Sequence, residues 1–510
     1  MFLALSAIAA LLLLAVWLLN KLDYYRTKQF AAWPQPRPSR VWGHMKDLNA
    51  FIARGEPNRH IEQVARSSKK FPYSMPKTPT LQAYKYLLGP DSIITSEGEE
   101  WKSLRKRFNP GFAPQHLLTL LPCILDKTGP FFEALDRYAQ SGEEFSLAEI
   151  CTNLTFDIIG AVTMDEDLGA QLPLDKQSEM VKLYHELAAS YRRKSSARAK
   201  LLNPLVTWRQ YTLARRLNTI IKNHIKRKFA ELKEASTNER KSRSVLALSL
   251  QDIEYLDARV LDQTCDQLKT FLFAGHDTTS ILLQWALYEL SRTPRALESI
   301  RRELDDVFGL DPSPAIVHDK LLAPNGEELL GKLQYTSAVI KEILRLYPSS
   351  GTGRFVPEGT GAYIQLPDGR SLCIDGVLMY NCETLIHRDE TVYGESKDDF
   401  VPERWLGEAG ASRIPSSAWR PFERGPRSCI GQGLATIEAQ VILACVVRRY
   451  EFRKIGLGEV ARDSAGEPIL NPRGQYEVKS RLFNTMQVTA KPVDGTIMKV
   501  KLSFGARKDL

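Results

Sequence analysis

The segment from Leu256 to Arg292 constrains the fold most, because it predicts one long helix. Its middle, from Phe271 to Leu290, is apolar on nearly every side. Such a helix has to be buried, since a surface helix needs a polar face. A second buried helix is predicted from Leu333 to Leu346, where Pro348 follows and ends it. We therefore expect a large, mainly helical body built around a central helix.

Strands are expected to be few, short and late in the chain. Two β-like pieces, Tyr363 to Leu366 and Leu372 to Ile374, flank a Pro-Asp-Gly turn, and a final helix runs from about Leu434 to Arg449. A basic helix from Leu201 to Lys233 suggests a solvated face, with a nucleic-acid or membrane-surface helix as the alternative. The fold class is therefore α+β, mainly α with small sheets.

The amino-terminal residues predict a membrane anchor. Phe2 to Leu19 contains one polar side chain, Ser6, and as a helix it would be about 27 Å long, close to the thickness of a thin bilayer. A cleaved signal peptide is the alternative, but no basic residue precedes the apolar run and no convincing cleavage site follows it. Lys21, Arg26 and Lys28 come afterwards, and the positive-inside rule then places the body in the cytosol.

Three segments are predicted: an anchor over residues 1–20, a basic and proline-rich linker over 21–40, and one domain over 41–510. Alternating prolines from Trp33 to Pro38 would hold the linker extended. The 7 cysteines contain no CxxC pair, which favours a reducing compartment and gives no zinc motif. A net charge of +9 over 510 residues is mild and does not by itself indicate nucleic acid.

Cys429 lies in the most informative segment, which runs from Phe422 to Gly431 with the sequence FERGPRSCIG. This loop leads into the last predicted helix, so backbone N–H groups would face the sulfur and favour its thiolate. Gly425 and Gly431 would let a flat ligand approach the backbone, and Arg427 could meet an anionic group on it. For Cys429 alone, an inert buried thiol would be the better interpretation.

The whole segment resembles the FxxGxRxCxG haem-binding signature of the cytochrome P-450 family, the haem-thiolate monooxygenases. Four further motifs are similar to those of the family and occur in its order: WxxxR at 101–105, the oxygen-activation motif at 274–279, ExxR at 342–345 and PER at 402–404. The resemblance spans roughly Pro34 to the carboxyl terminus and looks microsomal and fungal. It implies a helical prism around a buried haem, preceded by a transmembrane helix.

Site residues follow from the resemblance. It implies that Cys429 ligates the iron of haem b and that Glu342, Arg345 and Arg404 form a buried structural triad. Four residues are implied to meet the propionates: Trp101, Arg105, Arg354 and Arg427. The full set implied to bind the cofactor is Trp101, Arg105, Ala274, Arg354, Phe422, Arg427, Cys429 and Gly431.

Asp277 and Thr278 are the implied catalytic pair. A thiolate ligand favours O–O bond cleavage, which needs two protons delivered into a dry site. A carboxylate and a hydroxyl in mid-helix suit that relay, and a hydroxyl bonded back to its own helix is the alternative for Thr278. His276 occupies the variable position of its motif and is not expected to ligate a metal.

The implied reaction inserts one oxygen atom of O2 into an apolar small molecule. Electrons would come from NADPH through a separate NADPH–cytochrome P-450 reductase, with cytochrome b5 as a second candidate donor. Arg420 and Arg424 would form a basic docking surface, with Arg427 turned inward. The protein is expected to be a single-pass protein of the endoplasmic reticulum membrane, with a cytosolic catalytic domain. Its fungal character suggests secondary-metabolite biosynthesis and no nucleic-acid partner.

Three alternatives stay open. A haem-thiolate isomerase or dehydratase would need no reductase, although Asp277 and Thr278 argue against it. An inactive haem-binding membrane protein is the second, because the first sheet region, within Phe51 to Leu88, looks shortened. A basic nucleic-acid binder is the third. The substrate pocket is expected to be lined by four segments: Tyr73–Ser96, Phe271–Ala274, Ser349–Phe355 and Val488–Val493.

Overall fold

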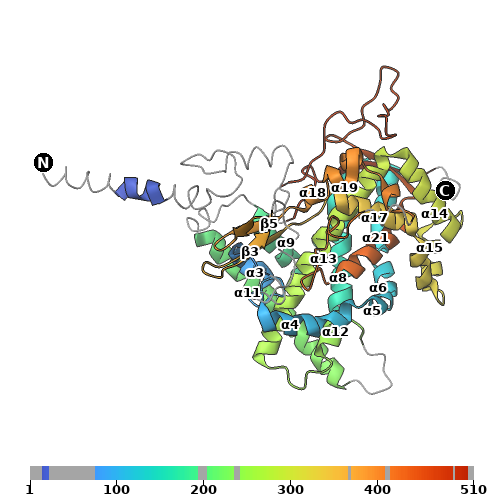
Figure 1. Cartoon of the computed structure of the whole chain (residues 1–510). Helices are drawn as coiled ribbons and strands as arrows, with labels where there is room; N and C mark the ends of the chain where they lie inside the picture. The colour runs from blue at the N-terminus through green and yellow to red at the C-terminus, as the bar shows by residue number, and fades with distance from the viewer. Residues whose placement is uncertain are drawn as a thin grey trace, which may run out of the picture. The chain divides into compact units, whose positions relative to one another are not determined.

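In a computed structural model of the chain, the predicted central helix is α13, Ala258–Arg292 (Figure 1). The Asp257 side chain caps its amino end by accepting a hydrogen bond from the Val260 N–H. Helix α8, Leu147–Met164, packs along α13. Gly275 permits this close approach, because a Cβ there would lie 2.6 Å from the Ile159 side chain. The prediction of a buried helix through the core is confirmed.

The structure describes residues 14–21, 75–192, 204–234, 242–365, 369–407, 414–485 and 489–503. The chain divides into two units, residues 1–60 and 61–510. In the first, residues 14–21 form a helix whose Leu14, Trp17 and Leu19 are exposed. Residues 1–13 of the predicted anchor and all of the predicted linker from residue 22 onward lie outside the described residues, so both stay predictions.

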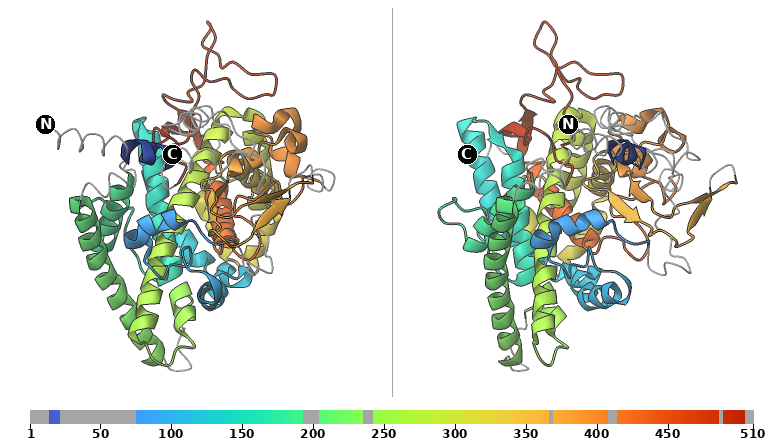
Figure 2. Two further views of the ribbon diagram at one scale, coloured as in Figure 1. Left: turned by 60° about the vertical axis from the view of Figure 1, so that its left-hand side comes forward. Right: turned by 90° about the vertical axis from the view of Figure 1, so that its left-hand side faces the viewer.

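Helices make up most of the second unit (Figures 1 and 2). Those before α13 are α3 (Lys85–Leu88), α4 (Gly98–Phe108), α5 (Pro114–Leu118), α6 (Leu121–Asp126), α7 (Gly129–Ser141), α8, α9 (Glu179–Arg192), α11 (Pro204–Glu234) and α12 (Val245–Leu250). Those after it are α14 (Pro294–Phe308), α15 (Pro314–Leu322), α16 (Leu329–Lys332), α17 (Gln334–Leu346), α18 (Glu383–Ile386), α19 (Glu390–Tyr393) and α21 (Gln432–Val446). The 3-10 helices are η3 (Pro79–Tyr84), η4 (Asn109–Phe112), η5 (Gly326–Glu328), η6 (Gly394–Asp398) and η7 (Pro402–Trp405).

Strands in the described residues form three small antiparallel sheets. The strands are β1 (Phe145–Ser146), β2 (Thr352–Phe355), β3 (Tyr363–Gln365), β4 (Ser371–Cys373), β5 (Leu378–Asn381), β6 (Tyr450–Lys454) and β7 (Ile497–Leu502). Their orders are β1-β7-β6, β2-β5 and β3-β4. The register of β3 and β4 pairs Tyr363 with Cys373, as the predicted hairpin requires. Between β6 and β7 the chain makes a long excursion away from the body (Figure 2).

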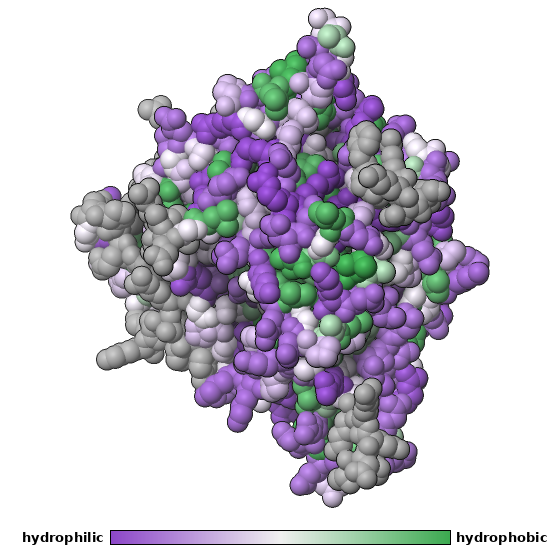
Figure 3. Space-filling view, turned by 90° about the vertical axis from the view of Figure 1, so that its right-hand side faces the viewer, coloured by the Kyte–Doolittle hydropathy of each residue, from purple (hydrophilic) through white to green (hydrophobic). Residues whose placement is uncertain are grey.

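The predicted elements agree with the observed ones within a few residues. α17 and α21 match the second buried helix and the final helix. α11 matches the basic helix, and it buries Leu217, Ile221 and Ile225. Hydrophilic side chains dominate the face of the molecule in Figure 3, where hydrophobic ones form small groups. Among the described residues, α8 has the length and apolar character of a membrane span, but it is mostly buried inside the protein.

Candidate active site

Cys429 lies just before the amino end of α21, in the loop that the sequence singled out. Its backbone N–H donates to the Phe422 carbonyl over 2.8 Å, which closes the loop. Arg105 on α4 donates to the Ser428 carbonyl over 2.7 Å and ties the loop to that helix. Gly431 is the residue before α21, and a Cβ there would meet one neighbouring atom, the Cys429 sulfur at 3.9 Å. The backbone beside the thiol is therefore open.

The Cys429 side chain is exposed, although the surrounding protein atoms partly desolvate its sulfur. Enclosure raises its pKa, whereas the N–H groups of Gly431 and Gln432 and the Arg105 guanidinium act in the opposite direction. The side chain is nevertheless exposed, in contrast to Cys445 on the same helix, which is fully buried and whose pKa is raised to about 12. Cys429 thus faces an opening, with groups around it that would favour a negative sulfur.

Helix α13 has an open stretch in its middle. From Thr264 to Leu290 every residue is buried except four, which are partly accessible: Phe273, Ala274, Gly275 and Thr278. Ala274 leaves space against the helix backbone, whereas the space beside Gly275 is filled by Ile159 of α8. α13 packs against α21, so this open stretch borders the helix that Cys429 precedes. The opening is where a bound group would fit between the cysteine and the central helix.

The predicted catalytic pair diverges in the structure. The Thr278 hydroxyl donates to the Ala274 carbonyl over 2.8 Å, which is the alternative bond considered for it. That leaves its oxygen lone pairs available on the accessible side. The Asp277 carboxylate instead binds the Thr489 hydroxyl and the Lys491 ammonium. Burial alone would raise the pKa of Asp277, but His276, Lys491 and Thr489 lower it, so this carboxylate is ionised at neutral pH.

His276 is a packed core residue. Its ring bonds the Leu272 carbonyl through Nδ1 over 2.6 Å and lies edge-on to Phe156 and Tyr184, with centroids 5.2 and 5.6 Å away. Among the described residues no group of three or more His, Cys, Asp or Glu side chains has metal-binding geometry. These contacts give His276 a packing role between α13, α8 and α9.

Arg354 and Arg427 are neighbouring cations. Arg427 lies over the Trp101 ring, 4.4 Å from its centroid, and donates to the Ser96 carbonyl over 2.7 Å. Arg354 on β2 is 3% exposed and donates to the Gly353 carbonyl. In the described part of the chain neither forms an ion pair, and the Nε atoms of both are buried without an acceptor. An anionic ligand would balance these two guanidinium groups, of which Arg354 is buried and Arg427 is partly buried.

These features fit a haem. A cysteine sulfur with nearby N–H groups suits the iron, an open stretch of α13 suits one face of the ring, and unpaired guanidinium groups suit the propionates. Of the residues implied to bind it, Trp101, Arg354 and Arg427 lie together, while Arg105 is directed at the Ser428 carbonyl near Cys429. Phe422 offers its carbonyl to the Cys429 loop, and its ring packs on Trp419.

The predicted triad is assembled. Glu342 and Arg345 on α17 are both fully buried and form an ion pair of 2.7 Å, and the Arg404 Nε donates to Glu342 over 3.0 Å. Glu342 also accepts from the Val401 N–H and the Trp405 indole over 2.9 Å each. Arg345 further donates to three carbonyls, those of His387, Lys397 and Asp399. This network fixes the segments that precede the Cys429 loop.

The predicted exposure of Arg420 is wrong. Arg420 is 2% exposed and pairs with Glu423 over 2.6 Å, so it cannot belong to a docking surface. Its backbone N–H donates to His387 Nε2, and burial lowers the pKa of this histidine to about 3. A backbone turn, in which the Glu423 N–H donates to the Arg420 carbonyl over 2.9 Å, brings the two side chains together. Arg424 is exposed, and Arg427 is turned inward as expected.

Four polar residues at the site were not predicted individually, although all but Glu438 lie in segments expected to line the pocket: Lys77, Glu438, Thr489 and Lys491. Glu438 is buried on α21 beside Thr279, and burial raises its pKa to about 8, so it is protonated at neutral pH. Thr489 and Lys491 lie in a segment that was expected to line the pocket, and they bind Asp277. Lys77 pairs with β2 and lies beside Arg354.

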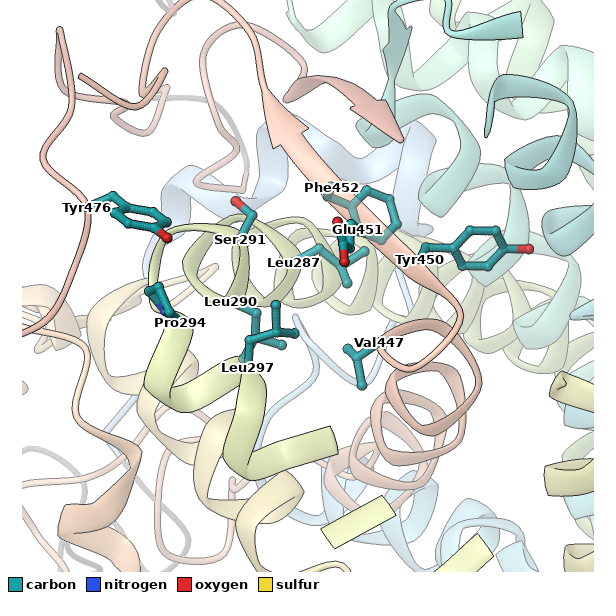
Figure 4. A pocket seen from close by; sticks show the side chains of 10 residues that line it. All are labelled: Leu287, Leu290, Ser291, Pro294, Leu297, Val447, Tyr450, Glu451, Phe452 and Tyr476. Atoms are coloured by element: carbon teal, nitrogen blue, oxygen red, sulfur yellow. The ribbon is translucent and has the colours of Figure 1, made fainter. Parts of the chain in front are cut away.

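A separate cavity of about 200 Å³ lies at the carboxyl end of α13 (Figure 4). Its walls come from α13, α14, β6 and the excursion before β7: Leu287, Leu290, Ser291, Pro294, Leu297, Val447, Tyr450, Glu451, Phe452 and Tyr476. None of these residues belongs to the Cys429 site, which is therefore a different feature of the molecule.

The fold and site together define a mainly helical protein built to hold a flat cofactor on a cysteine. The chain matches the Cytochrome P450 family over residues 56–480, and it belongs to that family. It is 30% identical over 468 residues to "Cytochrome P450 monooxygenase acrF" of Aspergillus aculeatus, covering 86% of this chain and 89% of that one.

Two further relatives and one solved structure are also similar to the chain. Human "Cytochrome P450 4V2" is 31% identical over 419 residues, covering 77% of this chain and 73% of that protein. "Cytochrome P450 monooxygenase polC" of Polytolypa hystricis is 28% identical, covering 74% and 68%. The crystal structure of the cytochrome P450 CYP102L1 superimposes with a TM-score of 0.66 at 18% identity, covering 84% of this chain and 88% of that one. The predicted fold is confirmed.

Proposed function

We propose that this protein is a membrane-anchored haem-thiolate monooxygenase that inserts one atom of O2 into an apolar small molecule. The net reaction takes O2, two electrons and two protons and returns the oxygenated product and water. The observation on which this proposal depends is the exposed Cys429 side chain. It is accompanied by the open stretch of α13 and by Arg354 and Arg427, which form no ion pair with the described residues. A thiolate-ligated haem, when bound, supplies the oxygen-activating chemistry.

The residues of the chain divide the remaining work. Trp101, Arg354 and Arg427 orient the cofactor through its propionates. The Gly431 N–H and the Arg105 guanidinium favour the negative form of the Cys429 sulfur, against the effect of burial. Positioning is therefore done by rigid elements, which is how a site keeps its geometry during turnover.

Proton delivery is assigned to Thr278 and Asp277 in different roles. The Thr278 hydroxyl, anchored by its bond to Ala274, accepts a hydrogen bond from a water on its open side and so positions the water that delivers the proton. Asp277, ionised and bound to Lys491, supplies negative charge at the edge of the path. Buried apolar neighbours such as Leu272 and Ile281 keep bulk water out of this part of the helix.

Electrons are proposed to come from NADPH through a separate reductase, with cytochrome b5 as an additional donor. Lys102 and Lys106 are exposed on α4, the helix whose Arg105 contacts the Cys429 loop, and Arg424 is exposed in that loop. These three cations replace the predicted surface that included Arg420, and they suit an acidic partner. We place the protein in the endoplasmic reticulum membrane, with the exposed apolar helix over 14–21 as part of its anchor.

We assign the reaction to secondary-metabolite biosynthesis, and the names of two relatives, acrF and polC, support the monooxygenase activity itself. Thr278 and Asp277, the proposed relay residues, disfavour an isomerase or dehydratase, because such an enzyme needs no protons delivered to oxygen. Product formation without NADPH would restore that alternative.

A carbon monoxide difference spectrum of the reduced protein in membranes tests the proposal. A Soret band at the thiolate-ligated position is expected, and Cys429→Ser should abolish it. Cys445→Ser is the matched control, because Cys445 is buried on α21 and should leave the band in place. Absence of the band from the wild-type protein, or its persistence in Cys429→Ser, would refute the assignment.

A further inference from the structure

Lys77 lies beside Arg354 because their backbones are paired. The two residues form an isolated antiparallel bridge, and the Phe355 N–H donates to the Pro76 carbonyl over 3.0 Å. Residues directly opposite one another in such a pair project to the same face, with Cβ atoms about 4.5–5.5 Å apart. The Lys77 ammonium and the Arg354 guanidinium therefore start from neighbouring positions on one surface.

Arg427 reaches the same place from the Cys429 loop. It donates to the Ser96 carbonyl over 2.7 Å, and the next residue, Glu97, accepts a hydrogen bond from the Lys77 backbone N–H. The segment Ser96–Glu97 therefore joins the two cations. Arg354 and Arg427 also act on the Lys77 ammonium electrostatically. Three cations from three distant parts of the chain converge here.

The charges at this cluster do not balance. Glu97 is one carboxylate among Lys77, Arg354 and Arg427, and when Lys77 is protonated 3 − 1 leaves two positive charges. Glu423 also acts on the cluster, but it is paired with Arg420 over 2.6 Å. In the described residues the Lys77 ammonium has no hydrogen bond or ion pair. Two unmatched positive charges are what a ligand with two carboxylates would neutralise.

We infer that Lys77 is a third propionate-binding cation, which acts with Arg354 and Arg427 to retain the haem. This inference rests on the proposed function and adds a residue to its cofactor site. The ammonium would donate to a propionate oxygen that the two guanidinium groups do not satisfy, and the bond would be charge-assisted. The haem would in turn provide the counterion that the cluster lacks.

Haem binding should then be linked to protonation of Lys77. Burial, with Arg354 and Arg427, lowers the pKa of Lys77 to about 7, while Glu423 and Glu97 act in the opposite direction. A bound propionate would raise this pKa toward the usual ammonium range. Between these two values haem binding takes up a proton, so affinity should fall by up to about tenfold for each pH unit above 7. Glu383, Arg420 and Arg105, which lie around Arg354 and Arg427, complete the charged groups nearby.

Transfer of haem to excess apomyoglobin, followed by absorbance from pH 6 to 9, tests the inference on the full-length protein. We compare the wild type, Lys77→Gln, Lys77→Arg and Lys85→Gln, because Lys85 is an exposed lysine of the next helix. For the Lys77→Gln variant, haem transfer at pH 7 should be at least about tenfold faster than for the wild type, since a charged hydrogen bond is lost. Its rate should also be independent of pH above 7. Lys77→Arg should retain haem tightly without the pH dependence, and Lys85→Gln should match the wild type.

A Lys77→Gln protein with wild-type transfer rates and pH profile would overturn the inference. If Lys77→Gln does not accumulate, Lys77→Arg decides: a wild-type pH profile in that variant would also overturn it. A wild-type protein that takes up no haem at any pH would overturn the proposed function itself. The two failures are therefore distinguishable.

Discussion

Removing Glu342 should cost more stability than removing any exposed carboxylate of the chain. This side chain is fully buried and accepts five hydrogen bonds, two from Arg345 and one each from Arg404, Val401 and Trp405. In Glu342→Ala the two guanidinium groups lose their shared counterion. Breaking a buried ion pair by removing one partner costs about 3–5 kcal/mol.

The unpaired Val401 N–H and Trp405 indole add to this cost, because a buried donor without an acceptor costs about 1–3 kcal/mol. The ion-pair loss alone lowers the ratio of folded to unfolded protein by a factor of about 10² to 10³ or more. Since folded proteins are stable by about 5–15 kcal/mol, most of the margin is lost. The Cys429 loop should be affected first, because the triad fixes the segments that lead to it.

Thermal loss of the thiolate-type Soret band in membranes measures this effect. Glu342→Ala should show little of the band at growth temperature. Glu298→Ala is the matched control, since Glu298 forms an exposed pair with Arg302 on α14 and should be near wild type. A Glu342→Ala protein with the wild-type midpoint would refute the reasoning that the buried network stabilises the site.

Three other outcomes are expected. Thr278→Ala should uncouple NADPH consumption from product formation and release hydrogen peroxide, and unchanged coupling would contradict the relay assignment. The pKa of Asp277 is lowered in the folded protein, so its stabilising contribution should be present above the unfolded pKa and should be lost on acidification. In Lys491→Met the burial of Asp277 should outweigh the remaining groups that lower its pKa. The thermal stability of this variant should therefore fall as pH rises. Charge reversal of Lys102 and Lys106 should lower reductase-supported turnover at low salt while sparing the difference spectrum, whereas equal turnover would exclude this docking surface.

Local sequence patterns predicted the framework of the site well. α13 follows from an apolar segment too long to be anything but a buried helix, and α17 follows from periodicity ended by Pro348. Glu342 and Arg345 were joined through their three-residue spacing on one helix face. Each of these inferences uses neighbours in sequence, where helix geometry fixes which side chains meet.

Contacts between distant segments were not predictable in the same way. Lys77 meets Arg354 through an isolated bridge between two segments that share no periodicity, so neither segment alone predicts the pair. Arg105 was assigned to the propionates through its motif, whereas the structure directs it to the Ser428 carbonyl. A motif fixes which residues lie near a site, but packing decides which group each long side chain reaches.

Asp277 and Thr278 show this limit most clearly, since they are consecutive in the sequence but their side chains have different surroundings. Consecutive residues of a helix point about 100° apart, so Asp277 can be directed away from the opening that Thr278 borders. Thr278 is accessible beside Ala274, and Asp277 is 5% exposed against the segment that carries Lys491. A proton relay through both residues therefore needs a connection that runs around the helix. Lys491 binds Asp277 from a segment that was expected to line the pocket, so Lys491 is the side chain placed to influence this connection.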